Sequence, residues 1–221
     1  SLLHHLNNNI AVIGHTSPSE NIQKRERKIV SKLVKEEQVI VSGLAKGCDV
    51  IAHEECMRLG GKTIAILPSP INEVLPKEHT KQAKQIVETG GLLISEYYTS
   101  PSNPRFEMTK RYIERDRLQA MFAKVVILIA SYAVKKGDSG ARHAMNKALK
   151  YKHQTCVMYD KKNDSHVDEM ELNKQFVEAG SVKVLAKAAR KNPAFITIDE
   201  IAKYRISTLE RVTSTKQDNL F

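Results

Sequence analysis

The sequence predicts an α/β fold: a doubly wound, mostly parallel sheet of the extended Rossmann-like kind, with helices on both faces. The first observation is that six short runs rich in Val, Ile and Leu alternate with longer amphipathic segments. The second is that these runs are continuously apolar, which is typical of parallel strands buried on both faces. With 221 residues, 41% of them hydrophobic, the chain is long enough to bury such a core.

Six strands and six helices are expected to follow one another in order. The strands are predicted at 10–14, 39–41, 63–67, 92–95, 124–130 and 155–159. The helical segments carry apolar residues at helical spacing or are bounded by Gly and Pro. They are predicted at 22–35, 49–59, 77–88, 106–122, 140–151 and 169–180.

The ends of the chain differ from this regular middle. We expect an N-terminal tail at 1–9, one Rossmann-like domain at 10–186, and a C-terminal helical extension and tail at 187–221. Within and after the domain, composition predicts a polar loop, an edge strand, an amphipathic helix and a frayed tail. These four segments lie at 161–168, 182–185, 195–208 and 214–221.

Composition narrows the classes of partner. The net charge of +10 favours a polyanion, with nucleic acid first and a nucleotide second. Aromatic residues make up only 5% and Trp is absent, which argues against a base-stacking platform across the sheet. Three scattered cysteines fit a reduced, cytoplasmic protein. No apolar run approaches the roughly 18 residues of a membrane span, and no secretory signal begins the sequence.

Familiar catalytic and cofactor motifs are missing. The sequence contains no GxGxxG after the first predicted strand, and no GxxxxGK[ST], GxSxG or HExxH. A dinucleotide-dependent dehydrogenase and a P-loop ATPase are therefore unsupported, and we expect neither a metal nor a cofactor. These absences favour a binding protein over an enzyme without deciding between them.

The turn after the second predicted strand is the strongest local signal. That strand ends at Ser42 and Gly43, and a turn through Gly47 leads into a helix that Asp49 is placed to cap. A strand that passes through a glycine turn into a helix presents free backbone N–H groups to an anion. Lys46 lies in the turn, so its side chain and the backbone can both reach a phosphate. An ordinary strand-to-helix connection remains the alternative.

Polar and glycine residues follow the other strands too. Because the carboxyl ends of parallel strands share one edge, we expect these residues to converge on one cationic hollow lined by backbone amides. They are Gly14 and His15, Ser42 and Gly43, Pro68 and Ser69, Ser95 and Glu96, Ser131, Ser139 and Gly140. His53 is expected to pack under the second turn, and Glu96 either to fix its loop or to contact the ligand.

A basic segment lies around the fourth predicted helix. Its cations are Arg105, Lys110, Arg111, Arg115 and Arg117, and Arg142 follows the next turn. On a helix, Arg111 and Arg115 would share one face, and Lys110 and Arg117 would share another. Such a run of charged residues most often forms a solvent-exposed helix face. A phosphate-binding role is favoured because the acidic residues between the cations do not fully offset them.

Four segments resemble one family when taken together. SGLAKGCD at 42–49 is followed by Ala52-His53, GLLISE occupies 91–96, Phe106 precedes RDRL at 115–118, and Ser139-Gly140 precedes Ala148. In this order and spacing they resemble the DprA/Smf family of DNA-processing proteins, within the wider SLOG group of Rossmann-like nucleotide-binding domains. The resemblance covers roughly residues 10–185.

The sequence departs from the family pattern at four positions. Lys46 stands where Arg is usual, Cys48 replaces Ile, Asp116 replaces Asn, and Ala144 replaces Thr. Lys keeps the charge of Arg but loses its bidentate fork. The accessory domains that often flank the family core are not evident, so the chain resembles a core-only or divergent member.

The resemblance implies a non-enzymatic protein that binds single-stranded DNA, forms a homodimer and hands the strand to the RecA recombinase during natural transformation and DNA recombination. The residues that it and the local patterns assign to phosphate contact are Gly14, Ser42, Gly43, Lys46, Gly47, Arg105, Lys110, Arg111, Arg115, Arg117, Ser139, Gly140 and Arg142. Asp49, His53, Ser95 and Glu96 are assigned to support or to the ligand.

Two alternatives stay open. A SLOG-type domain would bind a nucleotide, either as a sensor or as a phosphoribohydrolase that cleaves its N-glycosidic bond. Against the hydrolase, the PGGxGT-type turn is absent, since KGDSG occupies 136–140. The other alternative is a partner-binding scaffold that keeps the fold without the ligand.

Overall fold

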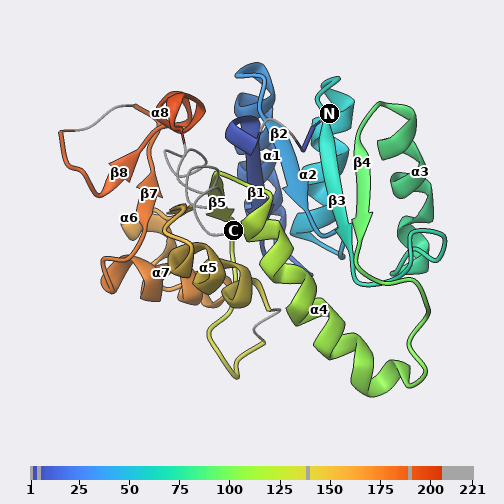
Figure 1. Cartoon of the computed structure of the whole chain (residues 1–221). Coiled ribbons are helices and arrows are strands. Elements are labelled where there is room, and N and C mark those ends of the chain that lie inside the picture. The colour runs from blue at the N-terminus through green and yellow to red at the C-terminus, as the bar shows by residue number, and fades with distance from the viewer. Residues whose placement is uncertain (1, 4–5, 138–139, 189–190, 206–221) are drawn as a thin grey trace, which may run out of the picture.

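The computed structural model describes residues 2–3, 6–137, 140–188 and 191–205, without the side chains of 104 and 105. It contains one eight-stranded sheet in which every pair of neighbouring strands is parallel (Figure 1). The strands are β1 (Asn9–Ile13), β2 (Val39–Ser42), β3 (Thr63–Leu67), β4 (Leu92–Ser95), β5 (Val125–Leu128), β6 (Gln154–Val157), β7 (Lys183–Leu185) and β8 (Phe195–Ile196). Their order is β4-β3-β2-β1-β5-β6-β7-β8, which confirms the predicted doubly wound fold.

Helices cover both faces of the sheet. They are α1 (Glu20–Lys35), α2 (Cys48–Arg58), α3 (Thr80–Glu88), α4 (Pro104–Met121), α5 (Ala141–Lys150), α6 (Lys161–Asp164), α7 (Glu171–Glu178) and α8 (Ile198–Lys203). Short 3-10 turns lie at η1 (Leu6–Asn8), η2 (Lys77–His79) and η3 (Asp168–Met170). Helices α1, α2, α3 and α8 pack on one face, and α4, α5 and α7 on the other.

The alternation of side chains along β1 shows how one strand serves both layers. Ile10 and Val12 belong to the core under α1 and α2, whereas Ala11 and Ile13 belong to the core under α4 and α5. All four are almost fully buried. This burial on both sides explains why the strand sequences are continuously apolar.

The end of the described chain differs from its prediction. A single helix was expected over 195–208, but the structure has strand β8, which adds to the sheet, followed by the short helix α8. Thr197 begins this helix with a capping box, in which its side chain accepts from the N–H of Glu200 and the Glu200 side chain accepts from the N–H of Thr197. Residues 206–208 and 214–221 lie outside the described residues.

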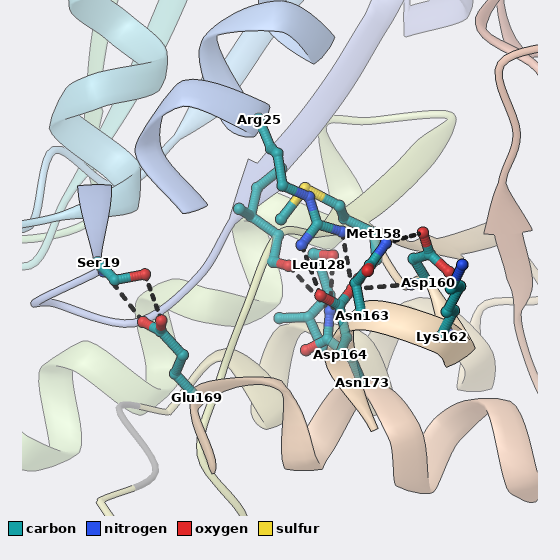
Figure 2. Close-up of polar contacts among 11 residues, drawn as sticks. Ser19, Arg25, Leu128, Met158, Asp160, Lys162, Asn163, Asp164, Glu169 and Asn173 are labelled. Carbon is teal, nitrogen blue, oxygen red and sulfur yellow. Dashed lines mark hydrogen bonds and ion pairs between the residues drawn. The ribbon is translucent and has the colours of Figure 1, made fainter. Parts of the chain in front are cut away.

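The connection from β6 to α7, expected as a polar loop at 161–168, contains α6 and is fastened to α1 (Figure 2). The Arg25 guanidinium on α1 donates two hydrogen bonds of 2.7 Å to the carboxylate of Asp164, which is buried. A few residues on, the Glu169 carboxylate accepts hydrogen bonds from the backbone and the hydroxyl group of Ser19, just before α1. Two carboxylates therefore hold this connection across the end of the sheet.

Asn173 on α7 fixes the far end of the same connection to the sheet. Its side-chain amide nitrogen lies within hydrogen-bond distance of the carbonyl oxygens of Leu128, Ile129 and Met158, at 3.2, 2.9 and 2.9 Å. Asn173 is fully buried, so water cannot replace these bonds. The amide ties α7 to the ends of β5 and β6.

Replacing Asn173 with Leu is expected to lower the free energy of unfolding by about 2 kcal/mol, because buried carbonyl groups lose a donor. Urea unfolding measures the loss. The matched control is Asn146→Leu on the exposed side of α5. Equal unfolding free energies for the two variants would contradict the role given to Asn173.

Candidate functional site

The carboxyl ends of β1, β2, β3 and β4 meet at one edge of the sheet, next to the point between β1 and β5 where the winding reverses. In open parallel sheets, ligands bind in the crevice at this position. Gly14, Ser42, Gly43, Ser95 and Gly140 all lie at or directly after the ends of strands or before the helix that follows. The structure therefore brings these predicted residues to one edge.

Two glycines allow the turns after β1 and β2 to touch. A Cβ atom on Gly14 would lie 2.5 Å from the sulfur of Cys48, and one on Gly47 would lie 2.5 Å from the carbonyl oxygen of His15. Gly47 also has a φ of +73°, a backbone angle that residues with a side chain rarely adopt. The N–H of Cys48 donates to the carbonyl of His15 at 3.2 Å. The backbones of the two turns are thus in direct contact.

Arg115 fills the space next to Gly43. A Cβ atom on Gly43 would lie only 1.2 Å from Nη1 of Arg115, whose side chain is 4% exposed. The guanidinium lies 3.6 Å from the Asp49 carboxylate and 3.2 Å from that of Asp116, and it donates to the carbonyl of Ile66 at 3.2 Å. These internal partners take the charge of Arg115 and solvent barely reaches it, and its assignment to phosphate contact stays a prediction.

Asp49 is part of the same buried cluster. It lies in the first turn of α2 rather than at its N-cap, which is Gly47, and its carboxylate accepts from the N–H of Ala45 at 3.4 Å. Burial raises the pKa of Asp49, and the neighbouring Arg115 opposes that rise. The carboxylate therefore holds the turn and the guanidinium together. The Asp49–Arg115 ion pair therefore fills the centre of the edge, where the sequence predicted an open cationic hollow.

Three other predicted cations lie at the surface. Lys46, Lys110 and Arg117 have side chains that are 59%, 76% and 34% exposed. Each has a carboxylate partner that is itself exposed. The pairs are Lys46–Glu78 at 3.0 Å, Lys110–Glu114 at 3.6 Å and Arg117–Glu96 at 2.5 Å. Exposed pairs of this kind contribute about 0–1 kcal/mol, so an incoming anion can replace the carboxylates.

Arg111 holds the loop between β4 and α4. Its guanidinium lies 4.3 Å from the centre of the Tyr97 ring and donates to the carbonyl of Thr99 at 2.8 Å. The Tyr97 hydroxyl donates to the Glu114 carboxylate at 2.8 Å. The Arg111 side chain is only 12% exposed, so its guanidinium serves this internal contact and contributes little to the charged surface.

The predicted serines and histidine turn inward. Ser42 donates its hydroxyl hydrogen to the carbonyl of Val12 at 2.7 Å, and Ser95 donates to the carbonyl of Ser69 at 2.7 Å. Each hydroxyl donor is therefore already used inside the fold, and the assignment of Ser42 to phosphate contact and of Ser95 to support or to the ligand stays a prediction. His53 is fully buried, and burial lowers its pKa to about 3, so it is neutral.

The remaining predicted residues lie around the start of α4 and α5. Gly140 precedes α5 with a φ of +91°, and a Cβ atom there would lie 3.4 Å from the Asp116 carboxylate. Arg142 is half-buried in the first turn of α5, with Nη2 3.5 Å from the His143 ring. Ser139 and the side chain of Arg105 lie outside the described residues, so their assignment stays a prediction.

A hollow of about 250 Å³ lies away from this edge, between α1, α8 and the segment after β7. Among the described residues, no group of three or more His, Cys, Asp or Glu side chains is arranged to hold a metal ion. No helix in the described part of the chain is both long and apolar enough to cross a membrane.

Sequence reasoning missed the acidic partners at the edge. Glu78 precedes α3 and lies more than 30 residues from Lys46, and Glu169 lies in η3, 150 residues from Ser19. No local pattern connects a carboxylate to its partner over such separations. Glu114 was visible in advance, because it follows Lys110 by four residues on one helix.

The sequence comparisons with known proteins agree on one family. Residues 1–192 match the family model described as DNA recombination-mediator protein A. Protein Smf of Synechocystis is 32% identical over 120 residues, which are 54% of this chain and 29% of that protein. DNA processing protein DprA of Streptococcus pneumoniae is 34% identical over 102 residues, which are 46% of this chain and 36% of that protein. The alignments thus span only about a third of each relative.

Solved structures give the same result. DprA from Streptococcus pneumoniae superposes with a TM-score of 0.67 and 25% identity, over 83% of this chain and 59% of that one. DprA from Helicobacter pylori, described for its single-stranded DNA binding mode, has a TM-score of 0.63 and 26% identity, over 83% and 77%. The molybdenum cofactor carrier protein of Chlamydomonas reinhardtii, at 15% identity and a TM-score of 0.53 over 88% and 93%, shares the fold alone.

Proposed function

Since this chain belongs to the family of DNA recombination-mediator protein A, we propose that it binds single-stranded DNA through exposed cations at the carboxyl edge of its sheet. The observation that carries the proposal is the set of three cations at the surface, the exposed Lys46 and Lys110 and the partly exposed Arg117, whose carboxylate partners also reach solvent. The Helicobacter pylori relative, described as binding single-stranded DNA, supports the choice of ligand.

Binding proceeds by exchange of partners. A backbone phosphate takes the place of Glu78 beside Lys46, and of Glu114 and Glu96 beside the cations of α4. Each new phosphate contact releases a counterion from the strand, so affinity falls as salt rises and depends little on base sequence. Phe106, one turn before Lys110 on α4 and 74% exposed, offers a ring on which a base can stack.

The test is a fluorescence-anisotropy titration with labelled oligo-dT at several salt concentrations. Replacing Lys46, Lys110 and Arg117 together by Ala is expected to weaken binding by about tenfold or more, and to reduce the slope of log affinity against log salt by about 2. Single Lys46→Ala should give a smaller loss in the same direction. These residues are exposed, so the fold should be kept.

The matched control removes the same net charge from α1, which packs on the face of the sheet opposite α4. Lys28, Lys32 and Lys35 are exposed along α1, and their joint replacement by Ala is expected to change affinity less than twofold. Equal losses in the two triple variants would mean that net charge alone drives binding. Absence of binding at low salt would remove the proposal.

Two finer features are proposed from the family resemblance. We propose that the protein protects the strand and delivers it to a RecA-type recombinase during transformation, and that it acts as a homodimer. Light scattering coupled to gel filtration measures the oligomeric state, and a RecA filament-assembly assay measures the delivery. A protein that stays monomeric at all concentrations would contradict the homodimer. Absence of any effect on filament assembly would contradict delivery to the recombinase.

A further inference from the structure

The turn from β1 into α1 is where a doubly wound parallel sheet ordinarily receives the phosphate of a nucleotide. In this chain a carboxylate already occupies that position (Figure 2). Glu169 accepts from the backbone N–H of Ser19 at 3.0 Å and from the Ser19 hydroxyl. Its Oε2 also lies 3.1 Å from Nε2 of His15.

The geometry assigns the proton of His15 to the nitrogen that faces Glu169. Nδ1 of this ring accepts from the N–H of Ser17 at 3.3 Å, so Nε2 carries the hydrogen and donates to the carboxylate. The ring is 2% exposed and stands edge-on to Tyr132, with 5.0 Å between ring centres. Three donors, from the backbone and side chain of Ser19 and from His15, therefore converge on one anionic group.

Glu169 is held in place by structure that does not depend on it. The connection that carries it is fastened to α1 by the Arg25–Asp164 pair, and α7 is tied to the sheet by Asn173. The carboxylate is thus a fixed part of the fold at the N-terminus of a 16-residue helix. Its charge repels a phosphate, and its oxygens use the hydrogen-bond donors that a phosphate would need.

We propose that Glu169 is a specificity-determining residue that excludes a nucleotide phosphate from the β1–α1 turn. The edge of the sheet is thereby reserved for a polyanion that contacts Lys46, Lys110 and Arg117, so the inference rests on the function proposed above. It also decides between the two ligand classes that the sequence leaves open. The chain takes the phosphates of a strand at its exposed cations, and does not take a mononucleotide at the turn.

The experiment compares thermal unfolding of the full chain with AMP or adenosine at millimolar concentration. Glu169→Ala frees the three donors, and AMP is expected to raise its melting temperature by about 3 °C or more at tenfold saturation, whereas adenosine is not. The wild type is expected to shift by less than about 0.5 °C with either compound. Asp168→Ala, which removes a neighbouring exposed carboxylate, is the control and should behave like the wild type.

A second variant guards against loss of folding. Glu169→Gln keeps the size and one oxygen acceptor but removes the charge, and is expected to gain a smaller AMP shift than Glu169→Ala. A wild type stabilised by AMP as strongly as the variants would overturn the proposal, as would folded variants that do not respond. Oligo-dT affinity, measured on the same proteins, should stay within twofold of wild type, so failure of DNA binding is seen separately.

Discussion

Replacing Arg115 with Met is expected to destabilise the fold by about 3–5 kcal/mol, because it leaves the Asp49 carboxylate buried without its counter-charge. The guanidinium lies 3.6 Å from this carboxylate and also donates to the carbonyl of Ile66. Met fills much of the same volume but offers neither charge nor donor. Urea unfolding at pH 7 measures the loss.

The deficit should grow with pH. Burial already raises the pKa of Asp49, and Arg115 is the main group that lowers it. Without the guanidinium, the folded protein holds the Asp49 proton more tightly than the unfolded chain does. Stability is then lost as pH rises through the folded-state pKa. Unfolding measured at pH 5 and at pH 8 should therefore show a larger difference between variant and wild type at the higher pH.

Two controls separate this internal role from a surface role. Arg117→Met removes a cation from an exposed pair and is expected to change stability by only about 0–1 kcal/mol. The double variant Asp49→Asn with Arg115→Met removes both charges and should recover part of the loss. Wild-type stability in Arg115→Met, together with a large loss of oligo-dT affinity, would show that Arg115 contacts the strand.

The sheet was predictable because its strands are encoded locally. Each apolar run is short, continuous and followed by a turn residue, and these features alone give a parallel sheet. The strand β8 and the start of α8 were missed because one amphipathic period runs through both, so a single helix was predicted from residue 195. The sequence Thr197-Ile198-Asp199-Glu200 nevertheless has the Ser/Thr-x-x-Glu pattern of a capping box, and this was the available signal for a helix start at that point.

The candidate site was only partly predictable, for a different reason. The sheet topology predicts that Ser42, Gly43 and Gly47 lie near the ends of other strands. It does not predict which face of α4 packs inward, because cations occupy both faces of this helix. The spacing placed Arg111 and Arg115 on one face without indicating that Arg115 is buried. Leu118, three residues after Arg115 and also buried, was the available signal. The contact of Glu169 with Ser19 spans 150 residues and depends on packing that no local pattern specifies.

Replacing Glu26 with Gln is expected to raise the free energy of unfolding by about 1–3 kcal/mol at pH 8, with little change near pH 4. Glu26 lies on α1, where it is fully buried, and within the described part of the chain its carboxylate oxygens have no hydrogen-bond partner apart from a weak contact with the Cys48 thiol. Burial raises the pKa of this group well above its ordinary value, and the nearby Cys48 thiol and Arg27 only partly oppose the rise. The folded protein therefore keeps a proton that the unfolded chain releases above about pH 4.5.

The sign of the pH dependence follows from this difference in proton binding. Between the unfolded and folded pKa values, the folded state binds more protons, so Glu26 makes the protein less stable as pH rises. Gln carries no charge at any pH, so the gain over wild type should increase from pH 4 up to the folded-state pKa of Glu26 and stay constant above it. Glu20→Gln, at a side chain that is 87% exposed on the same helix, should show no such trend. A difference between Glu26→Gln and wild type that stays constant across this range would mean that Glu26 ionises normally, and that the α1–α2 contact admits water at this carboxyl group.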